Sequence, residues 1–458
     1  MAFTPDIAAI RFGEGLAPDI APASSLDALL AQLKGPDLAA KAFPIEPFSN
    51  LHAEFAKVSA LQRASRRGRN GPDAEDLTKA YKVARRALNL RLQGAFAPTL
   101  SRSITSTQPF RERLTRFWAD HFTVVGKNNL TRNAVPAYIE ETIRSHIAGN
   151  FADMLKAVVT SPMMLDYLDQ NISVGPNSRG AKGRRGLNEN LARELLELHT
   201  LGVDGAYTQT DVRQLAELLT GLTTELGTGF TFRDKIVEPG GETVLGRTYG
   251  GGPPALGDVT AFLDDVARHP DTARHIAQKL AVHFTADSPD AGMVADMADV
   301  YLSTGGALVP VYEAMLRHPF AWDSFGQKVK QPLDFIASAL RVLEVPPASL
   351  QRLNRTKRAA YIVTPMTAMG QKWFRPAGPD GWPEEAEAWV TPQGLAARIQ
   401  WSMSAPSAFF RSLPDPRLFV GAALGDVADA QVKFAASAAE TRREGVGLVL
   451  ASPRFQRR

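Results

Sequence analysis

Two stretches of the sequence carry side chains that could do acid–base chemistry, and both have the periodicity of helices. In segment 189–200, Asn190, Arg193, Glu194 and Glu197 recur at steps of three and four residues, which places them on one helix face. We call these four residues the polar stripe. Two carboxylates one turn apart beside an arginine could hold a metal ion or exchange protons with a substrate. The alternative is a solvated face with ion pairs worth about 0.2–0.5 kcal/mol each.

His199 lies in the same segment, but a rotation of about 100° per residue turns it away from the polar stripe. A regular helix therefore cannot bring His199 to the same metal ion as Glu194 and Glu197. We expect no metal site here, and a histidine that packs against the protein interior.

The second stretch, 107–123, combines Trp118 and His121, which lie one helical turn apart among phenylalanines. One interpretation is an aromatic core in which Trp118 is buried and His121 bonds to a backbone carbonyl. The other is a pocket between helices 107–123 and 189–200, with Trp118 and His121 facing the polar stripe.

Residues 173–186, which we call the basic loop, concentrate glycines and cations just before the helix of the polar stripe. Unpaired N–H groups and the dipole at a helix N-terminus favour negative charge. We therefore expect an acidic ligand or an acidic protein partner here, against the alternative of a solvated loop without a ligand. The cations are Arg179, Lys182, Arg184 and Arg185.

Helical periodicity dominates the chain, as in the long amphipathic pattern from Pro72 to Ala97. Strand patterns are few, and the one expected hairpin pairs Phe230–Arg233 with Thr243–Tyr249. We predict an all-α fold, a large multi-helix globular domain spanning residues 1–458, with one small β-hairpin insertion at about 228–250.

The composition excludes several function classes. The chain has 458 residues with 52 Lys and Arg against 48 Asp and Glu, a net charge of +4, which is too weak to indicate a nucleic-acid partner. The absence of cysteine excludes disulfides, thiolate zinc sites and cysteine nucleophiles. No apolar run is long enough for a membrane span. The N-terminus lacks the pattern of a secretory signal, so we expect a cytoplasmic protein if the chain is complete at Met1, and an exported one if a signal was removed.

Nine motifs are distributed along the chain. The longest is Gly186–Gly205, and the others are Arg11–Gly15, Arg116–Thr123, Pro162–Leu168, Tyr207–Val212, Lys279–Phe284, Lys330–Pro332, Gly381–Pro383 and Ala451–Gln456. Together these motifs resemble a bacterial family known as domain of unknown function 1800. The resemblance implies one helical domain over essentially the whole chain, and no established activity. Members of that family often carry export signals and are often encoded beside proteins resembling alkaline-phosphatase-type hydrolases, which implies a phosphatase-like partner. Val237 departs from the pattern, because members commonly have histidine at this place before the acidic-glycine turn.

Neither the residues nor the resemblance defines a nucleophile, a metal triad or a cofactor, and the cofactor is unknown. We therefore favour a binding or assembly protein in which the polar residues form a structural network. The alternative is an enzyme, a metal-dependent or acid–base hydrolase or an oxidoreductase, with its pocket between helices 107–123 and 189–200.

Overall fold

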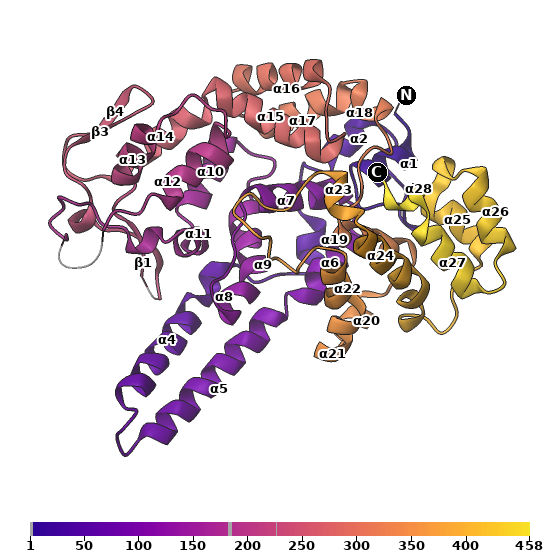
Figure 1. Cartoon of the computed structure of the whole chain (residues 1–458), viewed down its shortest axis with the longest axis horizontal. Coiled ribbons are helices and arrows are strands. Elements are labelled where there is room, and N and C mark those ends of the chain that lie inside the picture. Colours follow the sequence, from indigo (N-terminus) through magenta and orange to yellow (C-terminus); the bar gives the residue numbers. More distant parts are fainter. Residues whose placement is uncertain (1–2, 182–185, 226) are drawn as a thin grey trace.

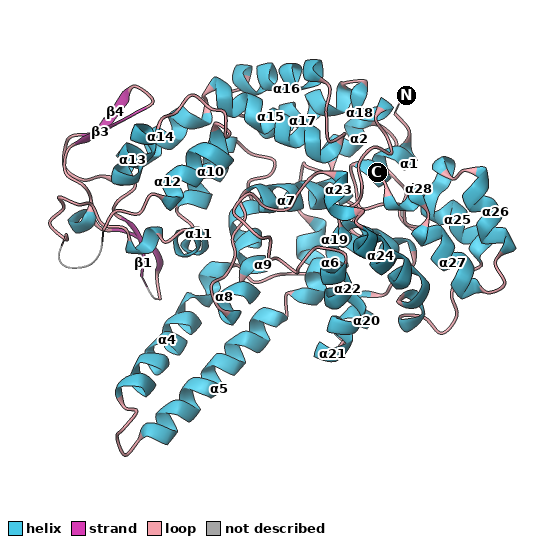
Figure 2. Ribbon diagram, in the orientation of Figure 1, coloured by secondary structure: helices cyan, strands magenta, loops and turns pink. Residues whose placement is uncertain are grey.

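The computed structural model describes residues 3–181, 186–225 and 227–458. Helices make up most of the described chain, and the strands form two small antiparallel sheets (Figure 2). The predicted all-α fold class is confirmed.

The chain runs through short and medium-length helices in sequence order (Figure 1). The N-terminal helices are α1 (Pro5–Arg11), α2 (Leu26–Ala31), α3 (Leu38–Ala42), α4 (His52–Arg67), α5 (Ala74–Gln93), α6 (Phe96–Thr105), α7 (Pro109–His121), α8 (Asn129–Asn133), α9 (Val135–Tyr138), the π-helical turn η2 (Ile139–Ile143), α10 (Phe151–Val159) and α11 (Pro162–Tyr167).

The middle of the chain contains both sheets. Its elements are α12 (Asn190–Glu194), the π-helical turn η4 (Leu195–Thr200), α13 (Gln209–Leu218), β1 (Leu222–Glu225), β2 (Gly229–Phe232), β3 (Gly241–Val244), β4 (Arg247–Gly250), α14 (Leu256–Ala267), α15 (Pro270–Phe284), α16 (Ala291–Ser303), α17 (Leu308–Arg317) and α18 (Phe320–Asp323).

The C-terminal part is again helical. It contains α19 (Pro332–Val342), α20 (Pro347–Gln351), α21 (Arg355–Arg358), the π-helical turn η6 (Ala359–Val363), α22 (Thr364–Ala368), α23 (Ala386–Trp389), α24 (Pro392–Ser404), α25 (Pro416–Leu424), α26 (Ala430–Ala438), α27 (Arg442–Ala451) and α28 (Pro453–Gln456).

The strands form two hairpins, so the expected pairing of Phe230–Arg233 with Thr243–Tyr249 is wrong. β1 pairs with β2, and β3 pairs separately with β4. Leu245 and Gly246 form the turn between β3 and β4 with φ angles of 51° and 77°. Two successive residues with positive φ make a tight turn whose twist matches a hairpin, and this local turn closes β3 onto its nearest neighbour in the chain.

Helices α4 and α5 pack against each other and project away from the body of the molecule (Figure 1). We call residues 52–93 the helical arm. Its base is held by Asn89, which accepts a hydrogen bond from Asn133 at 2.8 Å. Leu88 and Leu92 are buried near this base, whereas the outer part of the arm has mostly exposed side chains.

The interior contains two main hydrophobic cores. The first includes Phe110, Leu114 and Trp118 of α7 and extends through the helices up to α18. The second packs α6 and α19 against the C-terminal helices.

A layer of buried charge joins the two cores, and we call it the ionic layer. Asp334 of α19 forms ion pairs with Arg113 and Arg116 of α7 and with Arg458. Arg116 also pairs with the buried Glu14 at 2.6 Å. Opposite charges thus satisfy one another where α7 faces α19.

Within the part of the chain that the structure describes, no helix is long and apolar enough to cross a membrane.

Candidate functional site

Helix α7 presents two different faces, and the aromatic one is buried. The sequence starts this helix with Pro109, whose fixed φ suits a first helical turn. Trp118 is fully buried, and its indole N–H donates to the hydroxyl of Tyr312 at 2.6 Å. His121 is also buried, and its Nε2 donates to the carbonyl of His199 at 3.2 Å. Trp118 and His121 therefore lie in the core, where α7 directly contacts turn η4.

The polar stripe lies at the surface of α12 and η4. Asn190 is exposed, whereas Arg193, Glu194 and Glu197 are half-buried. Arg193 donates to Gln209 at 2.9 Å and pairs with Glu189 at 3.4 Å. The stripe thus links α12 to the start of α13.

Glu194 faces a loop of the C-terminal half as well as its own helix. Burial, and then repulsion by Glu197, raise the pKa of Glu194 above its usual value, and Asp380 adds to this repulsion. Asp380 also raises the pKa of Asp120, which lies in the last turn of α7. The carboxylates of Glu194 and Asp120 therefore lie near the same loop.

The two buried histidines His121 and His199 meet the half-buried His275 behind the polar stripe. The His121 ring centroid lies 6.1 Å from those of both His199 and His275. Burial lowers the pKa of His199 to about 3 and that of His275 to about 4, so all three rings stay neutral at neutral pH. Among the described residues no group of three or more His, Asp or Glu side chains has the arrangement of a metal site.

The other face of α7 lines a cavity of about 120 Å³, which we call the α7 cavity. Glu112, Arg116, Ala119 and Asp120 form its floor at helical spacing. Most of its surface is apolar, and its aromatic wall comes from a segment far along the chain. The wall consists of Trp373, Phe374 and Trp382.

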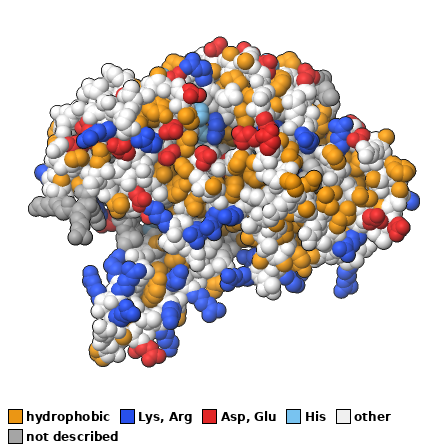
Figure 3. Space-filling model, viewed as in Figure 1, with side chains coloured by type: hydrophobic (Ala, Val, Ile, Leu, Met, Phe, Trp, Pro, Cys, Tyr) orange, Lys and Arg blue, Asp and Glu red, His pale blue; other side chains and the backbone are white. Residues whose placement is uncertain are grey.

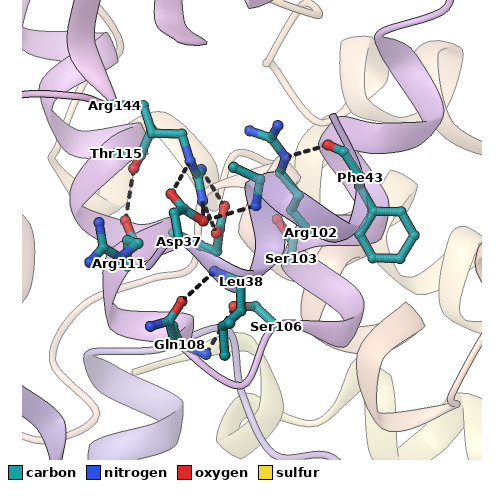
Figure 4. Close-up of polar contacts among 12 residues, drawn as sticks. Asp37, Leu38, Phe43, Arg102, Ser103, Ser106, Gln108, Arg111, Thr115 and Arg144 are labelled. Carbon is teal, nitrogen blue, oxygen red and sulfur yellow. Dashed lines mark hydrogen bonds and ion pairs between the residues drawn. The ribbon is translucent and has the colours of Figure 1, made fainter. Parts of the chain in front are cut away.

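One end of the α7 cavity is charged, but its charges are paired. Arg144, which follows turn η2, donates to Glu112 at 2.5 Å. It also donates to Asp37 at 2.6 Å (Figure 4). Burial alone would raise the pKa of Asp37, but the hydrogen bond and charge of Arg144 outweigh burial and hold this pKa below its usual value. Arg102 is bound in the same way by Glu140 at 2.5 Å.

The opposite end of the cavity contains a carboxyl group that stays protonated at neutral pH. The backbone N–H of Trp382 donates to both oxygens of Asp120, at 3.1 and 3.2 Å. Burial and repulsion by Glu384 raise the pKa of Asp120 to about 8. A side chain at Gly381 would clash with Asp120, because a Cβ there would lie 2.8 Å from its carboxylate. The close approach of this loop to α7 thus requires glycine.

His283 also lines the cavity, and it is neutral. Its Nδ1 donates to Glu384 at 2.6 Å, and its Nε2 accepts from Arg113 at 3.1 Å. Burial lowers the pKa of His283, and Glu384 offsets only part of this effect. His283 and Asp120 are therefore two neutral groups that could give or take a proton in the cavity.

The basic loop is only partly described, because Lys182, Arg184 and Arg185 lie outside the described residues. Arg179 is exposed and forms an ion pair with Asp234 at 3.1 Å.

Val237 lies in the lining of a separate cavity of about 260 Å³ between this loop and the hairpins. The carboxylates of Glu217, Glu238 and Glu242 line it too. Burial, and then repulsion by Glu217, raise the pKa of Glu242 to about 7. Val237 thus sits among acids, at the position where the resemblance leads one to expect histidine.

The sequence indicated α7 as a candidate element, but the two residues selected on it, Trp118 and His121, lie on the face that is buried in the core. Glu112, Arg116 and Asp120 recur at intervals of four residues, which is the signal of a second, polar face on an otherwise aromatic helix. The aromatic wall gives no such signal, because Trp373 and Trp382 are brought to α7 only by the fold.

Comparison with protein families identifies the chain. The family model described as "Protein of unknown function (DUF1800)" matches residues 8–457, nearly the whole length. The protein belongs to this family. Comparison of this DUF1800 chain with curated proteins and with solved structures finds no match.

Proposed function

We propose that this DUF1800 protein is a binding protein that takes a small, mainly apolar ligand into the α7 cavity, and that the ionic layer has a structural role. The proposal rests on the observation that several family motifs meet at the α7 cavity. Four of the nine motifs that carry the family resemblance come from distant parts of the chain, and each of these four contributes lining residues to this one cavity. The contributions are Arg116, Asp120 and Thr123 from the α7 motif, His283 from α15, Gln331 from the turn before α19, and Trp382 from the Gly-Trp-Pro motif.

The chemistry of the lining supports binding. Concave sites with an apolar and aromatic lining and a few polar groups are typical of small-molecule binding. Arg102 and Arg144 are already neutralised by carboxylates, so they do not call for an anionic ligand. The protonated carboxyl of Asp120 can donate a hydrogen bond, which suits a ligand with a carbonyl or ether oxygen at one end.

Filling the cavity tests this proposal. Ala119 lies on the floor, so Ala119→Leu should occupy the space beside Asp120. The exposed Ala80 of α5 offers a matched control, Ala80→Leu. We expect an uncharged fluorescent apolar probe, N-phenyl-1-naphthylamine, to bind the unaltered protein and Ala80→Leu equally and Ala119→Leu at least tenfold more weakly. Equal binding by all three proteins at unchanged melting temperature would refute the cavity as the site.

A second candidate function is an enzyme that uses acid–base chemistry at the same place. It is favoured by the pKa of Asp120, which is raised to about 8, because a carboxyl that is protonated at neutral pH can act as a general acid. Glu194 of the polar stripe, near the same loop, has a raised pKa as well. Asp120→Asn keeps the shape but loses the proton, so turnover of ester substrates should fall about 100-fold or more while probe binding is retained. If the unaltered protein turns over no such substrate, the binding role stands alone.

A further inference from the structure

The helical arm has mostly exposed side chains and contributes no residue to the lining of the α7 cavity. It projects from the body as a pair of antiparallel helices (Figure 1), and Lys and Arg side chains gather along it (Figure 3). The cations of its outer part are all exposed: Arg63, Arg66, Arg67, Arg69, Lys79, Lys82, Arg85 and Arg86.

The arm holds more than the entire positive excess of the protein. Residues 52–93 contain ten Lys and Arg and four Asp and Glu, a net charge of +6. The whole chain has 52 against 48, a net charge of +4, so the rest of the protein carries −2. This separation of charge orients the arm toward a negatively charged surface and the body away from it.

The cations of the outer arm are not used inside the protein. Arg63 donates to the hydroxyl of Ser59 at 2.9 Å, and no cation between residues 63 and 86 forms an ion pair with a carboxylate of the described residues. At the base of the arm, by contrast, Arg91 pairs with Glu46. The outer cations are therefore free to contact an external anion.

Apolar side chains lie among these cations on the outer face of α5. Leu77, Tyr81 and Leu88 mark the face that packs inward, and the opposite face carries Val83 and Leu90. The side chains of these two residues are 62% and 59% exposed. At 100° per residue, Lys79, Val83, Arg86 and Leu90 fall on one stripe.

We propose that the helical arm docks on an anionic phospholipid bilayer. Its cations contact the headgroups, and the side chains of Val83 and Leu90 insert into the interfacial region of the bilayer. Four to eight Lys and Arg on an amphipathic helix are the pattern that binds anionic lipids, and exposed aliphatic side chains on the same face add apolar contact. A polynucleotide or an acidic protein would use the cations, but neither would explain two exposed aliphatic residues between them.

The test measures binding of the full chain to vesicles of phosphatidylcholine alone and of phosphatidylcholine with 30 mol% phosphatidylglycerol. We expect binding only to the anionic vesicles, weakening as salt is raised. Near an anionic surface each cation contributes about fivefold in affinity, so Lys79→Gln/Lys82→Gln/Arg85→Gln/Arg86→Gln should bind several hundredfold more weakly.

A matched control removes four exposed cations elsewhere, in Arg375→Gln/Arg411→Gln/Arg417→Gln/Lys433→Gln. Both quadruple variants have the same net charge, so only the location of the charge differs. The control should keep at least a third of the affinity of the unaltered protein. Val83→Ser/Leu90→Ser should weaken binding about tenfold at any salt concentration.

Three results would overturn the proposal. The first is absence of binding to the anionic vesicles by the unaltered protein. The second is equal loss in both quadruple variants. The third is binding of a 20-base-pair duplex DNA or of polyglutamate that is tighter than vesicle binding and is lost in the arm variant alone, which would assign the arm to that partner. Melting temperatures of all variants check that they fold.

Discussion

Trp118 and Tyr312 form a hydrogen bond across the first core, with the indole N–H 2.6 Å from the phenol oxygen. The hydroxyl of Tyr312 in turn donates to the carbonyl of Ile147 at 2.8 Å. This chain of two bonds connects α7, α17 and the segment before α10, which are far apart in the sequence. The wide ring system of Trp118 is thus fixed in orientation as well as buried.

Loss of this tryptophan should strongly destabilise the protein. We expect Trp118→Ala to reduce the free energy of unfolding by about 3–5 kcal/mol, as truncation of large buried aromatic residues does. Tyr312→Phe should cost about 1–3 kcal/mol, because it leaves a buried N–H and a buried carbonyl without their partner. Phe434 is 73% exposed, so the control Phe434→Ala should change stability by less than about 0.5 kcal/mol. Urea unfolding measures all three, and a Trp118→Ala value close to the control would contradict the prediction.

Asp334 balances the ionic layer, and its loss should be costly. Asp334→Asn leaves Arg113, Arg116 and Arg458 buried without their shared carboxylate. Removal of one partner from a buried ion pair costs about 3–5 kcal/mol. The exposed Asp296 of α16 provides the control Asp296→Asn, for which we expect no measurable change. Chemical denaturation compares the two variants, and equal stabilities would show that the layer contributes little.

The buried His199 and the half-buried His275 make the protein sensitive to acid. Burial lowers the pKa of His199 to about 3 and that of His275 to about 4, whereas an unfolded histidine binds a proton below about pH 6.5. The unfolded state therefore takes up more protons on acidification. The stabilising contribution is complete above pH 6.5 and is lost as the pH falls toward the folded pKa values.

At pH 5 each of these histidines should have lost about 2 kcal/mol of this contribution. We expect the melting temperature to fall between pH 7.5 and pH 5. Nitrogen NMR of labelled histidine should show neutral imidazole rings for His199 and His275 at pH 5 in the folded protein. Rings that titrate near pH 6.5 without unfolding would contradict this prediction.

The basic loop provides a test of the proposed acidic ligand or partner. In the unaltered protein, acidic probes such as polyglutamate should protect this loop from cleavage by thermolysin, a protease that does not cut at Lys or Arg. Replacement of Arg179, Lys182, Arg184 and Arg185 by serine should abolish this protection. The unaltered protein should become more resistant when the probe is added, because bound anions hold the loop at the helix N-terminus. Equal cleavage with and without probe in the unaltered protein would leave the loop as a solvated segment.

Local features of the fold could be predicted from the sequence. The aromatic spacing and Pro109 indicated the helix that the structure shows as α7. The long amphipathic pattern that begins near Pro72 corresponds to α5. These helices depend on interactions between residues a few positions apart, so the spacing of residue types in the sequence is enough to predict them.

Features that depend on distant residues could not be predicted in this way. Arg458 and Asp334 are 124 residues apart, and periodicity says nothing about which buried charges will meet. The aromatic wall of the α7 cavity likewise reaches α7 only through the path of segment 371–382. Turn η4 is a subtler case. The backbone N–H of Leu201 bonds to the carbonyl of Leu196 at 2.9 Å, a π-helical widening that a spacing of 100° per residue does not anticipate.

The ionic layer has a consequence for the partly folded protein. If one hydrophobic core forms before the other, the surface it leaves open at their boundary presents Arg113, Arg116 and Glu14 to water. Such a surface is well solvated, whereas an apolar one would attract other chains. The charged boundary should therefore protect the partly folded molecule against aggregation until the second core packs against the first. We expect refolding to remain efficient at high protein concentration.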